Sequence, residues 1–314
     1  MSRISTSVLD GLFAPTKSLP TWLLYDAAGS ALYERITELP EYYLARAEAE
    51  LFVSHGREIV ALAGHGASEL SLAEIGAGSA EKTRTLARQL AEERGRGVFL
   101  ACDISESALA VARENLEAAD ARVEVRTCLG THLDAIPTIA ALPGRQLLLW
   151  VGSSIGNHPD DEAVRLLREL RRALRPDARL LLGTDLKKDP AVLVAAYDDA
   201  AGVTAQFTKN ILARLNRELG CSFDLADFRH VAEWNAEASN MEISLEAIRA
   251  VRIVVEGHVR PLELARGERI HIEISAKYDE ARARSILEAA GFARERRFLD
   301  SAGRYAVELA RVVA

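Results

Sequence analysis

The stretch LAEIGAGSAEKT, residues 72–83, decides the fold of this chain. Its first residues predict the end of a buried strand, its glycines predict a tight turn, and its last residues predict the start of a helix. Gly76 and Gly78 let the backbone turn sharply and approach a ligand closely. A strand, a glycine turn and a helix in this order are typical of α/β sheets that bind a nucleotide or a related ligand.

Strands and helices alternate regularly around this turn. The predicted strands are residues 68–76, 97–103, 122–128, 146–152 and 178–186. The predicted helices are residues 57–65, 79–95, 105–120 and 160–176. This alternation predicts βαβ units with right-handed crossovers, and therefore an α/β fold with a doubly wound, Rossmann-like sheet.

The pattern changes after Lys188. Residues 189–220 predict a long helical stretch, either continuous or broken. Residues 231–257 and 267–278 alternate polar and apolar side chains, which predicts antiparallel strands with one exposed face. A predicted helix and two predicted strands close the chain, at residues 279–291, 293–300 and 304–312.

These patterns predict two domains, each built from two segments. We expect residues 51–187 and 279–314 to form the doubly wound domain. We expect residues 1–50 and 188–278 to form an inserted α+β domain, because the N-terminal segment is rich in aromatic residues that can pack on the insertion.

The composition excludes several classes of protein. The formal net charge of the 314 residues is −7, which argues against a nucleic-acid partner. No apolar stretch is long enough to span a membrane, and the first residues lack the apolar core of a signal peptide. The three cysteines have no CxxC spacing and cannot all pair. We therefore expect a monomeric cytoplasmic protein with reduced thiols and no metal site.

The residues near the glycine turn indicate the kind of ligand. Asp103 ends the next predicted strand, where its carboxylate can accept hydrogen bonds from two ribose hydroxyls; the alternative is a tight turn beside a solvated aspartate. A dinucleotide site would need a third glycine where this chain has Glu81, and an acid is unfavourable beside a pyrophosphate. S-Adenosylmethionine carries a ribose, an adenine and an amino acid but no phosphate, and fits this pattern better.

Several motifs together resemble one family over nearly the whole chain. They are YDAAGSALYERITELPEYYLARAEAE (residues 25–50), EIGAGSAEKTR (74–84), GSSIGN (152–157), AAYDDAAGVTAQFTKNILARLNRELG (195–220) and IEISAKY (272–278). The chain is similar to the histidine-specific N-methyltransferases of ergothioneine biosynthesis, the EgtD family. The resemblance implies a methyltransferase fold, S-adenosylmethionine as cofactor with S-adenosylhomocysteine as product, and free L-histidine as the small-molecule substrate.

The resemblance also implies cofactor-binding roles. It assigns the cofactor to the glycine turn with Gly76 and Gly78, to Lys82 and to Asp103. The family usually has an acid and an aromatic residue beside the adenine. Thr131 and His132 stand at those two positions in this chain.

The stretch GSSIGN follows an apolar predicted strand and contains a candidate substrate residue. The amide of Asn157 can donate a hydrogen bond to a carboxylate and accept one from an amine, which suits a free amino acid. The alternative is that Asn157, or Asp160 in its place, only caps the following helix. The resemblance implies that Asn157 and Tyr197 bind the substrate carboxylate and that Gly152 lets the backbone pass close to the amine.

Tyrosines in the N-terminal segment are further candidates. The resemblance places Tyr25 near the amine, as a catalytic residue together with Asn157, and Tyr42 near the imidazole. Packing between the N-terminal segment and the insertion is the alternative for all of these tyrosines, and it is the role we expect for Tyr33 and Tyr43.

The predicted strand RIHIEISAKY carries the candidates for side-chain selection. Glu273 and Ser275 lie about 7 Å apart along one face of a strand, together with Arg269, His271 and Lys277. A carboxylate and a hydroxyl at this spacing can both reach the N–H groups of an imidazole; the alternative is a solvated strand face. Ile243 stands where the family often has a methionine, and it keeps that wall apolar.

These residues predict three successive methyl transfers to the α-amino group of histidine, which yield hercynine. A sulfonium is a strong electrophile, so alignment and exclusion of water are the main requirements. We expect no covalent nucleophile, a proton transfer to solvent or through Tyr25, and a surface role for His158. The alternatives are the same reaction on another amino acid or small amine, a nicotinamide-dependent oxidoreductase, and a non-catalytic protein that binds the cofactor as a signal.

Overall fold

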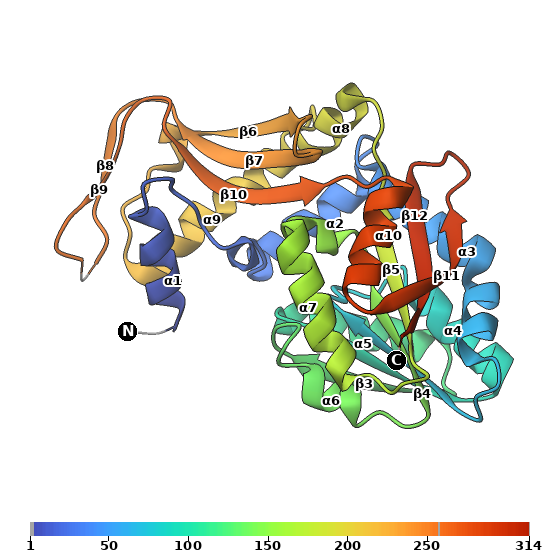
Figure 1. Cartoon of the computed structure of the whole chain (residues 1–314). Coiled ribbons are helices and arrows are strands. Elements are labelled where there is room, and N and C mark those ends of the chain that lie inside the picture. The colour runs from blue at the N-terminus through green and yellow to red at the C-terminus, as the bar shows by residue number, and fades with distance from the viewer. Residues whose placement is uncertain (1–2, 257, 314) are drawn as a thin grey trace. The chain divides into compact units, whose positions relative to one another are not determined.

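The computed structural model describes residues 3–256 and 258–313 (Figure 1). Contacts between residues divide the chain into two compact units. Unit 1 comprises Met1–Tyr43 and Lys188–Ser275, and unit 2 comprises Leu44–Lys187 and Ala276–Ala314. Each unit is described separately below.

Unit 2 is built on a seven-stranded sheet with the order β11-β12-β5-β4-β1-β2-β3. Its strands are β1 (Leu70–Ile75), β2 (Gly97–Asp103), β3 (Val123–Leu129), β4 (Arg145–Trp150), β5 (Arg179–Asp185), β11 (Phe292–Leu299) and β12 (Tyr305–Val312). Strands β1 to β5 pair in parallel, and β12 pairs antiparallel with both β5 and β11. The predicted doubly wound, Rossmann-like sheet is confirmed.

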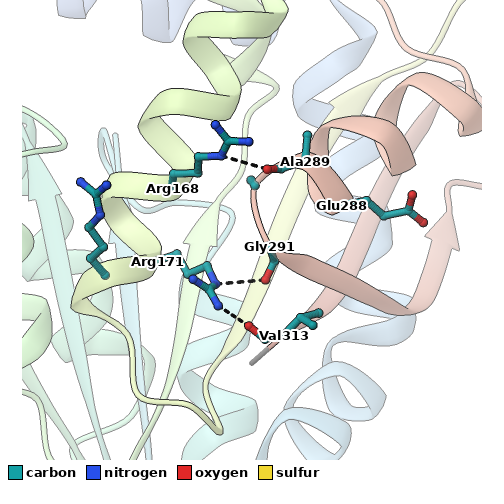
Figure 2. A pocket seen from close by; sticks show the side chains of 8 residues that line it. Arg168, Arg171, Glu288, Ala289, Gly291 and Val313 are labelled. Atoms are coloured by element: carbon teal, nitrogen blue, oxygen red, sulfur yellow. Dashed lines mark hydrogen bonds between the residues drawn. The ribbon is translucent and has the colours of Figure 1, made fainter.

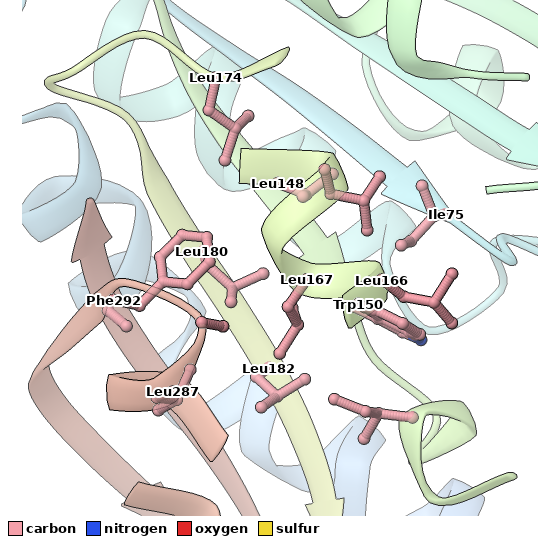
Figure 3. Packing of buried hydrophobic residues seen from close by; sticks show 14 of the residues in the cluster. Ile75, Leu148, Trp150, Leu166, Leu167, Leu174, Leu180, Leu182, Leu287 and Phe292 are labelled. Atoms are coloured by element: carbon pink, nitrogen blue, oxygen red, sulfur yellow. The ribbon is translucent and has the colours of Figure 1, made fainter. Parts of the chain in front are cut away.

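The helices of unit 2 form two layers because its central strands are apolar on both sides. Along β4, Leu147 and Leu149 belong to one buried cluster, and Leu148 and Trp150 belong to the other. The first cluster includes residues of α3 (Tyr43–Gly64), α4 (Arg84–Arg94) and α5 (Glu106–Ala119). The second, drawn in Figure 3, includes residues of α6 (Ile136–Ala140), α7 (Asp160–Ala173) and α10 (Glu280–Ala289). Continuous apolar strands of this kind are typical of parallel sheets with helices on both faces.

Two elements of unit 2 differ from the sequence-based expectation. Helix α4 begins at Arg84 rather than near residue 79, because residues 80–83 form a separate tight turn in which Ala80 has a φ of +53°. Helix α6 is not predicted from the sequence, because its five residues are too short for a helical period to emerge.

Unit 1 combines helices with a small sheet. Its sheet has the order β10-β7-β6, made of β6 (Phe228–Asn235), β7 (Asn240–Ala247) and β10 (Arg269–Ala276), and a separate pair is made of β8 (Val251–Ile253) and β9 (Leu262–Leu264). Its helices are α1 (Arg3–Leu12), η1 (Thr21–Leu24), α2 (Ala27–Glu38), α8 (Pro190–Tyr197), α9 (Val203–Leu219) and η3 (Leu225–Asp227). The predicted antiparallel pairing is observed between β6 and β7.

The long helical stretch after Lys188 is broken between α8 and α9. The carboxylate of Asp199 accepts hydrogen bonds from the backbone N–H groups of Val203 and Thr204, at 2.9 and 2.7 Å. Gly202 adopts a left-handed conformation with a φ of +69°, which turns the chain into α9. An acid that satisfies the first N–H groups of a helix is a strong start signal, so the break follows from the sequence DDAAG.

No described helix is long and apolar enough to cross a membrane.

A fully buried ion pair lies at the end of β5. The Nζ atom of Lys277 is 2.8 Å from a carboxylate oxygen of Asp185, and both side chains have no exposed surface. The backbone N–H of Asp185 also donates to the hydroxyl of Ser153, at 2.9 Å. Each of these buried charges is stable here only as part of the ion pair, because a single buried charge would lose its hydration without compensation.

We predict that Lys277→Met destabilises the protein by about 3–5 kcal/mol, because it leaves the charge of Asp185 buried without its partner. Lys187→Met is the matched control: Lys187 pairs with Asp279 at 2.9 Å, but both side chains are well exposed. The control should cost less than about 1 kcal/mol. Urea unfolding followed by circular dichroism measures both values, and equal stabilities of the two variants would contradict the prediction.

Candidate functional site

The glycine turn after β1 is held against the end of β2. Gly76 and Gly78 have φ angles of +68° and +54°, a conformation that favours glycine. The backbone N–H of Gly78 donates to Asp103 Oδ2 at 2.8 Å, and that of Ala77 donates to the carbonyl of Cys102 at 3.0 Å. The structure therefore brings both glycines and Asp103 together at the carboxyl edge of the sheet.

Asp103 has a structural role in this turn in addition to its predicted role. Its Oδ1 atom accepts from the backbone N–H of Ser105 at 2.8 Å, and its Oδ2 atom accepts from Gly78. Each carboxylate oxygen can accept about two hydrogen bonds, so both retain capacity for a ligand hydroxyl. The side chain is half-buried.

Lys82 and Gly152 are linked through a residue that is not predicted from the sequence. Lys82 forms an ion pair with Glu48 of α3, and the backbone N–H of Gly152 donates to Glu48 Oε1 at 2.6 Å. Glu48 is fully buried, while its neighbours Ala47 and Leu51 are buried core residues. In the sequence, Glu48 could be noticed as an acid on the apolar face of a helix. That pattern does not predict which residues the acid contacts.

Glu74 is a second buried acid near the glycine turn. It lies at the end of β1, and its carboxylate accepts from the hydroxyl of Thr83 at 2.6 Å. Burial raises the pKa of Glu74 to about 8, although the bond from Thr83 and the charge of Lys82 oppose this shift. Its carboxyl group is therefore mostly protonated at neutral pH, which makes Glu74 a hydrogen-bonding group rather than an anion.

The segment GSSIGN forms a sharp turn and the short helix η2 (Ser154–Asn157). Gly152 and Ser153 both have positive φ angles, +73° and +58°. Asn157 ends η2, is half-buried, and has no side-chain hydrogen bond to any described residue. Helix α7 is preceded by Pro159 without a side-chain cap, and Asp160 instead pairs with Arg282 at 2.8 Å. Both capping alternatives, for Asn157 and for Asp160, are therefore wrong.

Thr131 and His132 lie in different surroundings. Thr131 is exposed, and its hydroxyl donates to Asp134 at 2.7 Å. The ring of His132 lies 5.0 Å from the ring of Trp150, and His158 lies 6.2 Å from both. Burial lowers the pKa of His132 to about 4 and also lowers the pKa of His158. His158 is thus half-buried beside an aromatic cluster, and its Nδ1 atom lies 3.6 Å from the partly exposed carboxylate of Glu162.

In unit 1 the structure brings together Tyr197 and Ser275. Their hydroxyl oxygens are 2.8 Å apart, and both side chains are buried. His230 holds the end of α8, because its Nε2 atom lies 2.8 Å from the carbonyl of Tyr197 and its Nδ1 atom lies 2.9 Å from the hydroxyl of Thr208. A carbonyl only accepts, so Nε2 carries a proton. Burial lowers the pKa of His230.

Aromatic rings gather around Tyr197. Tyr25, Tyr33, Tyr42, Tyr197 and Phe207 form a chain of contacts with ring centroids 5.7 to 6.4 Å apart. Tyr42 is buried, and burial raises its pKa well above 10. The predicted site tyrosines thus share one cluster with Tyr33, for which only packing was expected, and with Phe207, which is not predicted because a phenylalanine in a helix carries no specific signal.

Tyr43 lies apart from these rings. The Nζ atom of Lys188 donates to its hydroxyl at 2.6 Å and lies 4.4 Å from the centre of its ring. The side chain is buried, in agreement with the packing role expected for it.

Strand β10 follows the predicted alternation over most of its length. Ile270 and Ile272 are buried, whereas His271 and Glu273 are half-buried. The alternation ends before Lys277, which lies beyond β10 and is fully buried on Asp185, so its expected place on the exposed face is wrong. On β7, Ile243 is buried between Met241 and Leu245, as expected for an apolar wall.

Comparison with known proteins places the chain among methyltransferases. A family model described as histidine-specific, SAM-dependent methyltransferase matches residues 4–312. The chain belongs to this family. The histidine N-alpha-methyltransferase of Mycolicibacterium smegmatis is 39% identical over 303 residues, which cover 96% of this chain and 92% of that protein. The namesake from Mycobacterium tuberculosis is 38% identical over 96% and 93% of the two chains. The N-methyltransferase fsqC of Aspergillus fumigatus is 29% identical over 91% and 77%.

The family membership has direct consequences. The chain is a methyltransferase that uses S-adenosylmethionine, and its substrate is a small molecule. The oxidoreductase and non-catalytic alternatives are therefore wrong. The residues at the carboxyl edge of unit 2 fit the cofactor: a side-chain carbon at Gly76 or Gly78 would meet no atom within 4 Å, so this edge has open space for a ligand beside Asp103.

The methyltransferase has no obvious cation site in the part of the chain that the structure describes. Among residues 3–256 and 258–313, no group of three histidine, cysteine, aspartate or glutamate side chains is placed to hold a metal ion. The three cysteines are free thiols, and burial raises the pKa of Cys221 to about 11.

A shallow hollow of unit 2 is lined by residues of α7, the end of α10 and the C-terminal strand (Figure 2). Arg168 donates to the carbonyl of Ala289 at 2.9 Å, and Arg171 donates to the carbonyls of Gly291 and Val313. The carbonyls of Ala289 and Gly291 lie at the end of α10, where a positive charge is favourable, and that of Val313 follows β12. The hollow of the methyltransferase is thus explained by helix packing, and it contains none of the predicted site residues.

The buried acid of the methyltransferase gives a pH prediction. Glu74 binds its proton with a pKa of about 8 in the folded protein and near 4.5 in the unfolded chain. Its contribution to stability is complete below pH 4.5 and is lost as the pH rises through 8. Between these values the free energy of unfolding of the wild type should fall, relative to Glu74→Gln, by up to about 1.4 kcal/mol per pH unit.

Urea unfolding at pH values of about 5.5, 6.5 and 7.5 measures this difference. Glu81→Gln is the control, because Glu81 is exposed and pairs with Arg84 on the surface. Its stability should follow the wild type with pH. Parallel curves for Glu74→Gln and the wild type would show that Glu74 is ionised in the folded state.

Proposed function

We propose that this enzyme transfers three methyl groups from S-adenosylmethionine to the α-amino group of free L-histidine and produces hercynine. The observation that carries the proposal is the buried pair of hydroxyls of Tyr197, at the end of α8, and Ser275, 2.8 Å apart. Ser275 lies on β10, the strand that also holds Glu273. Buried polar groups of this kind require a polar ligand or each other. The names of the two mycobacterial relatives support histidine as that ligand.

The imidazole is assigned to the polar groups of β10. Glu273 accepts a hydrogen bond from one ring N–H, and Ser275 bonds the second ring nitrogen. Leucine or phenylalanine in this place would offer no N–H group to Glu273 or Ser275 and would lose these hydrogen bonds with the protein. Tyr42, which is neutral up to high pH, packs beside the ring.

The carboxylate and the amine are assigned to a second set of residues. The amide of Asn157 and the hydroxyl of Tyr197 hold the carboxylate, and Gly152 gives the amine close access to the backbone. The open hydrogen-bonding capacity of Asn157 supports this assignment, since its side chain has no partner among the described residues. Tyr25 orients the amine, and before each transfer the nitrogen loses one proton to solvent, directly or through the hydroxyl of Tyr25, so that its lone pair can attack the methyl carbon.

The cofactor is assigned to the carboxyl edge of the sheet in unit 2. S-Adenosylmethionine supplies an electrophilic methyl group on a sulfonium. The glycine turn with Gly76 and Gly78 leaves space for it, Asp103 binds the ribose hydroxyls, and Lys82 binds its only anionic group, the α-carboxylate. Thr131 and His132 lie beside the adenine, and the neutral state of His132 at pH 7 supports an aromatic rather than an ionic contact.

We further propose that residues 51–187 and 279–314 form the cofactor-binding domain and residues 1–50 and 188–278 the substrate-binding domain. The division into unit 2 and unit 1 supports these boundaries within a few residues. The net charge of −7 supports the absence of a nucleic-acid partner, and the three free cysteines support a cytoplasmic location. We also propose that the enzyme is a monomer without a membrane partner.

The same reaction on another free amino acid or small amine is the second candidate. Ile243 favours it, because a branched residue gives the apolar wall of β7 a different shape from the methionine that is frequent in the family. A relative named only as an N-methyltransferase also matches most of the chain.

The first test incubates the purified enzyme with S-adenosylmethionine and an equal mixture of the twenty amino acids, followed by mass spectrometry. We expect trimethylated histidine and no change in the other amino acids. Methylation of a different amino acid would support the methyl-transfer reaction and contradict the residues proposed to bind histidine. The absence of any methylated product, despite binding of the cofactor, would reject free amino acids as substrates.

The second test changes the residue assigned to the imidazole. Glu273→Gln should lower kcat/KM for histidine roughly 10- to 100-fold, because a charge-assisted hydrogen bond is lost. Glu246→Gln is the control, since Glu246 belongs to the same sheet but pairs with Arg229 and Arg269 at the surface. Steady-state kinetics with histidine as the varied substrate measures both, and equal values for the two variants would contradict the assignment.

A further inference from the structure

Glu48 is a buried carboxylate whose partners come from three separate segments of unit 2. Its Oε2 atom forms the ion pair with Lys82, which precedes α4. Its Oε1 atom accepts from the backbone N–H of Gly152, after β4, and from the hydroxyl of Tyr305, at the start of β12, both at 2.6 Å. The side chain of Glu48 has no exposed surface. A buried charge with three donors is fully compensated, so Glu48 joins these segments firmly.

A glycine in strand β5 leaves the space that the carboxylate of Glu48 occupies. A side-chain carbon at Gly183, in β5, would lie 2.5 Å from the hydroxyl of Tyr305 and 2.9 Å from Glu48 Oε1. The same carbon would lie 3.1 Å from the Cα atom of Val151. These distances are too short for any residue with a side chain, so the glycine in the middle of an apolar strand creates the space that Glu48 and Tyr305 occupy.

The two groups that Glu48 holds are both assigned to ligand binding. The side chain of Lys82 is 29% exposed although its ammonium group is paired with the fully buried Glu48, so part of this side chain is accessible to a ligand. Gly152 has a φ of +73°, and a side-chain carbon at this position would lie 3.9 Å from Lys82 Nζ. The lysine and the turn after β4 are thus neighbours that share one anchor.

We propose that Glu48 is a positioning residue for the cofactor. It fixes the ammonium group of Lys82 and the turn at Gly152, so that Lys82 receives the α-carboxylate of S-adenosylmethionine in a single orientation, and Glu48 itself does not touch the cofactor. A lysine side chain is long and flexible, and an anchored ammonium group loses less conformational freedom when the ligand binds. The inference rests on the proposed function of Lys82 as the ligand of that carboxylate.

Calorimetric titration with S-adenosylhomocysteine tests the proposal without any amino-acid substrate. In Glu48→Gln the amide oxygen can still accept from Gly152 and Tyr305, but the charge opposite Lys82 is lost. We expect Kd for S-adenosylhomocysteine to rise about tenfold or more, a factor typical for the loss of a charged hydrogen bond. KM for S-adenosylmethionine should rise with it, while KM for histidine should change little.

Glu50→Gln is the matched control on the same helix. Glu50 accepts from the backbone N–H of Ser301 at 2.8 Å and has no contact with Lys82 in the structure. Its Kd should equal that of the wild type. A role of Glu48 in stability alone would lower the melting temperature and leave Kd unchanged.

A double-mutant cycle with Lys82→Met isolates the positioning effect. If Glu48 acts through Lys82, Glu48→Gln should have little further effect on Kd in the Lys82→Met background. Additive effects of the two substitutions would overturn the proposal, as would an unchanged Kd in Glu48→Gln. Glu48→Asp serves if Glu48→Gln fails to fold: the shorter carboxylate cannot reach both Lys82 and Gly152, so its Kd should also rise, and an unchanged value would overturn the proposal.

These measurements distinguish a failure of the Glu48 proposal from a failure of the proposed function. If the wild type binds S-adenosylhomocysteine but does not methylate histidine, the proposed substrate is wrong. The role of Glu48 is then judged from the Kd values of the variants alone. An enzyme that methylates histidine, with equal Kd in the wild type and Glu48→Gln, would reject the role of Glu48 and retain the function.

Discussion

The central strands of unit 2 bury both faces, and this constraint governs the rest of the enzyme. Residues 147–150 of β4 alternate between two helix layers, so every side chain in the middle of the strand is used for packing. Groups that bind a ligand must therefore lie beyond the carboxyl ends of the strands. The glycine turn, Asp103 and Gly152 all lie there, and so does Tyr305 at the start of β12, which pairs with Asp185 at the carboxyl end of β5.

Several buried carboxyl groups lie at the same edge, and the protein stabilises them in different ways. Asp185 and Glu48 form ion pairs with Lys277 and Lys82. Glu74 has no such direct ion pair and instead holds its proton to about pH 8. Charge at the proposed cofactor site is therefore controlled by buried pairs and by protonation. Such an arrangement keeps the turns rigid and limits the reorganisation that binding requires.

The candidate site residues of unit 1 are mainly hydroxyl groups and aromatic rings. Tyr197 is held at its carbonyl by His230 and at its hydroxyl by Ser275, so its position is determined at two points. The surrounding tyrosines and Phe207 supply apolar faces with few charges. These hydroxyls and rings are the surface to which the imidazole of the proposed substrate is assigned, and a polar ring can form hydrogen bonds there that an apolar analogue cannot.

The sequence by itself determined the doubly wound sheet, the glycine turn with Asp103, and the family, because hydrophobic period, glycine positions and motifs are local properties of the chain. It left open whether residues 189–220 form one helix or two. Only the tertiary structure decided that Glu48 joins Gly152, 104 residues away, and that Tyr197 meets Ser275, 78 residues away. It also decided that His158 packs on Trp150 and that Lys277 leaves the face of its strand. The physical reason is that buried polar groups take their partners from whichever strand end or helix the fold brings next to them, and no local pattern in the chain records that choice.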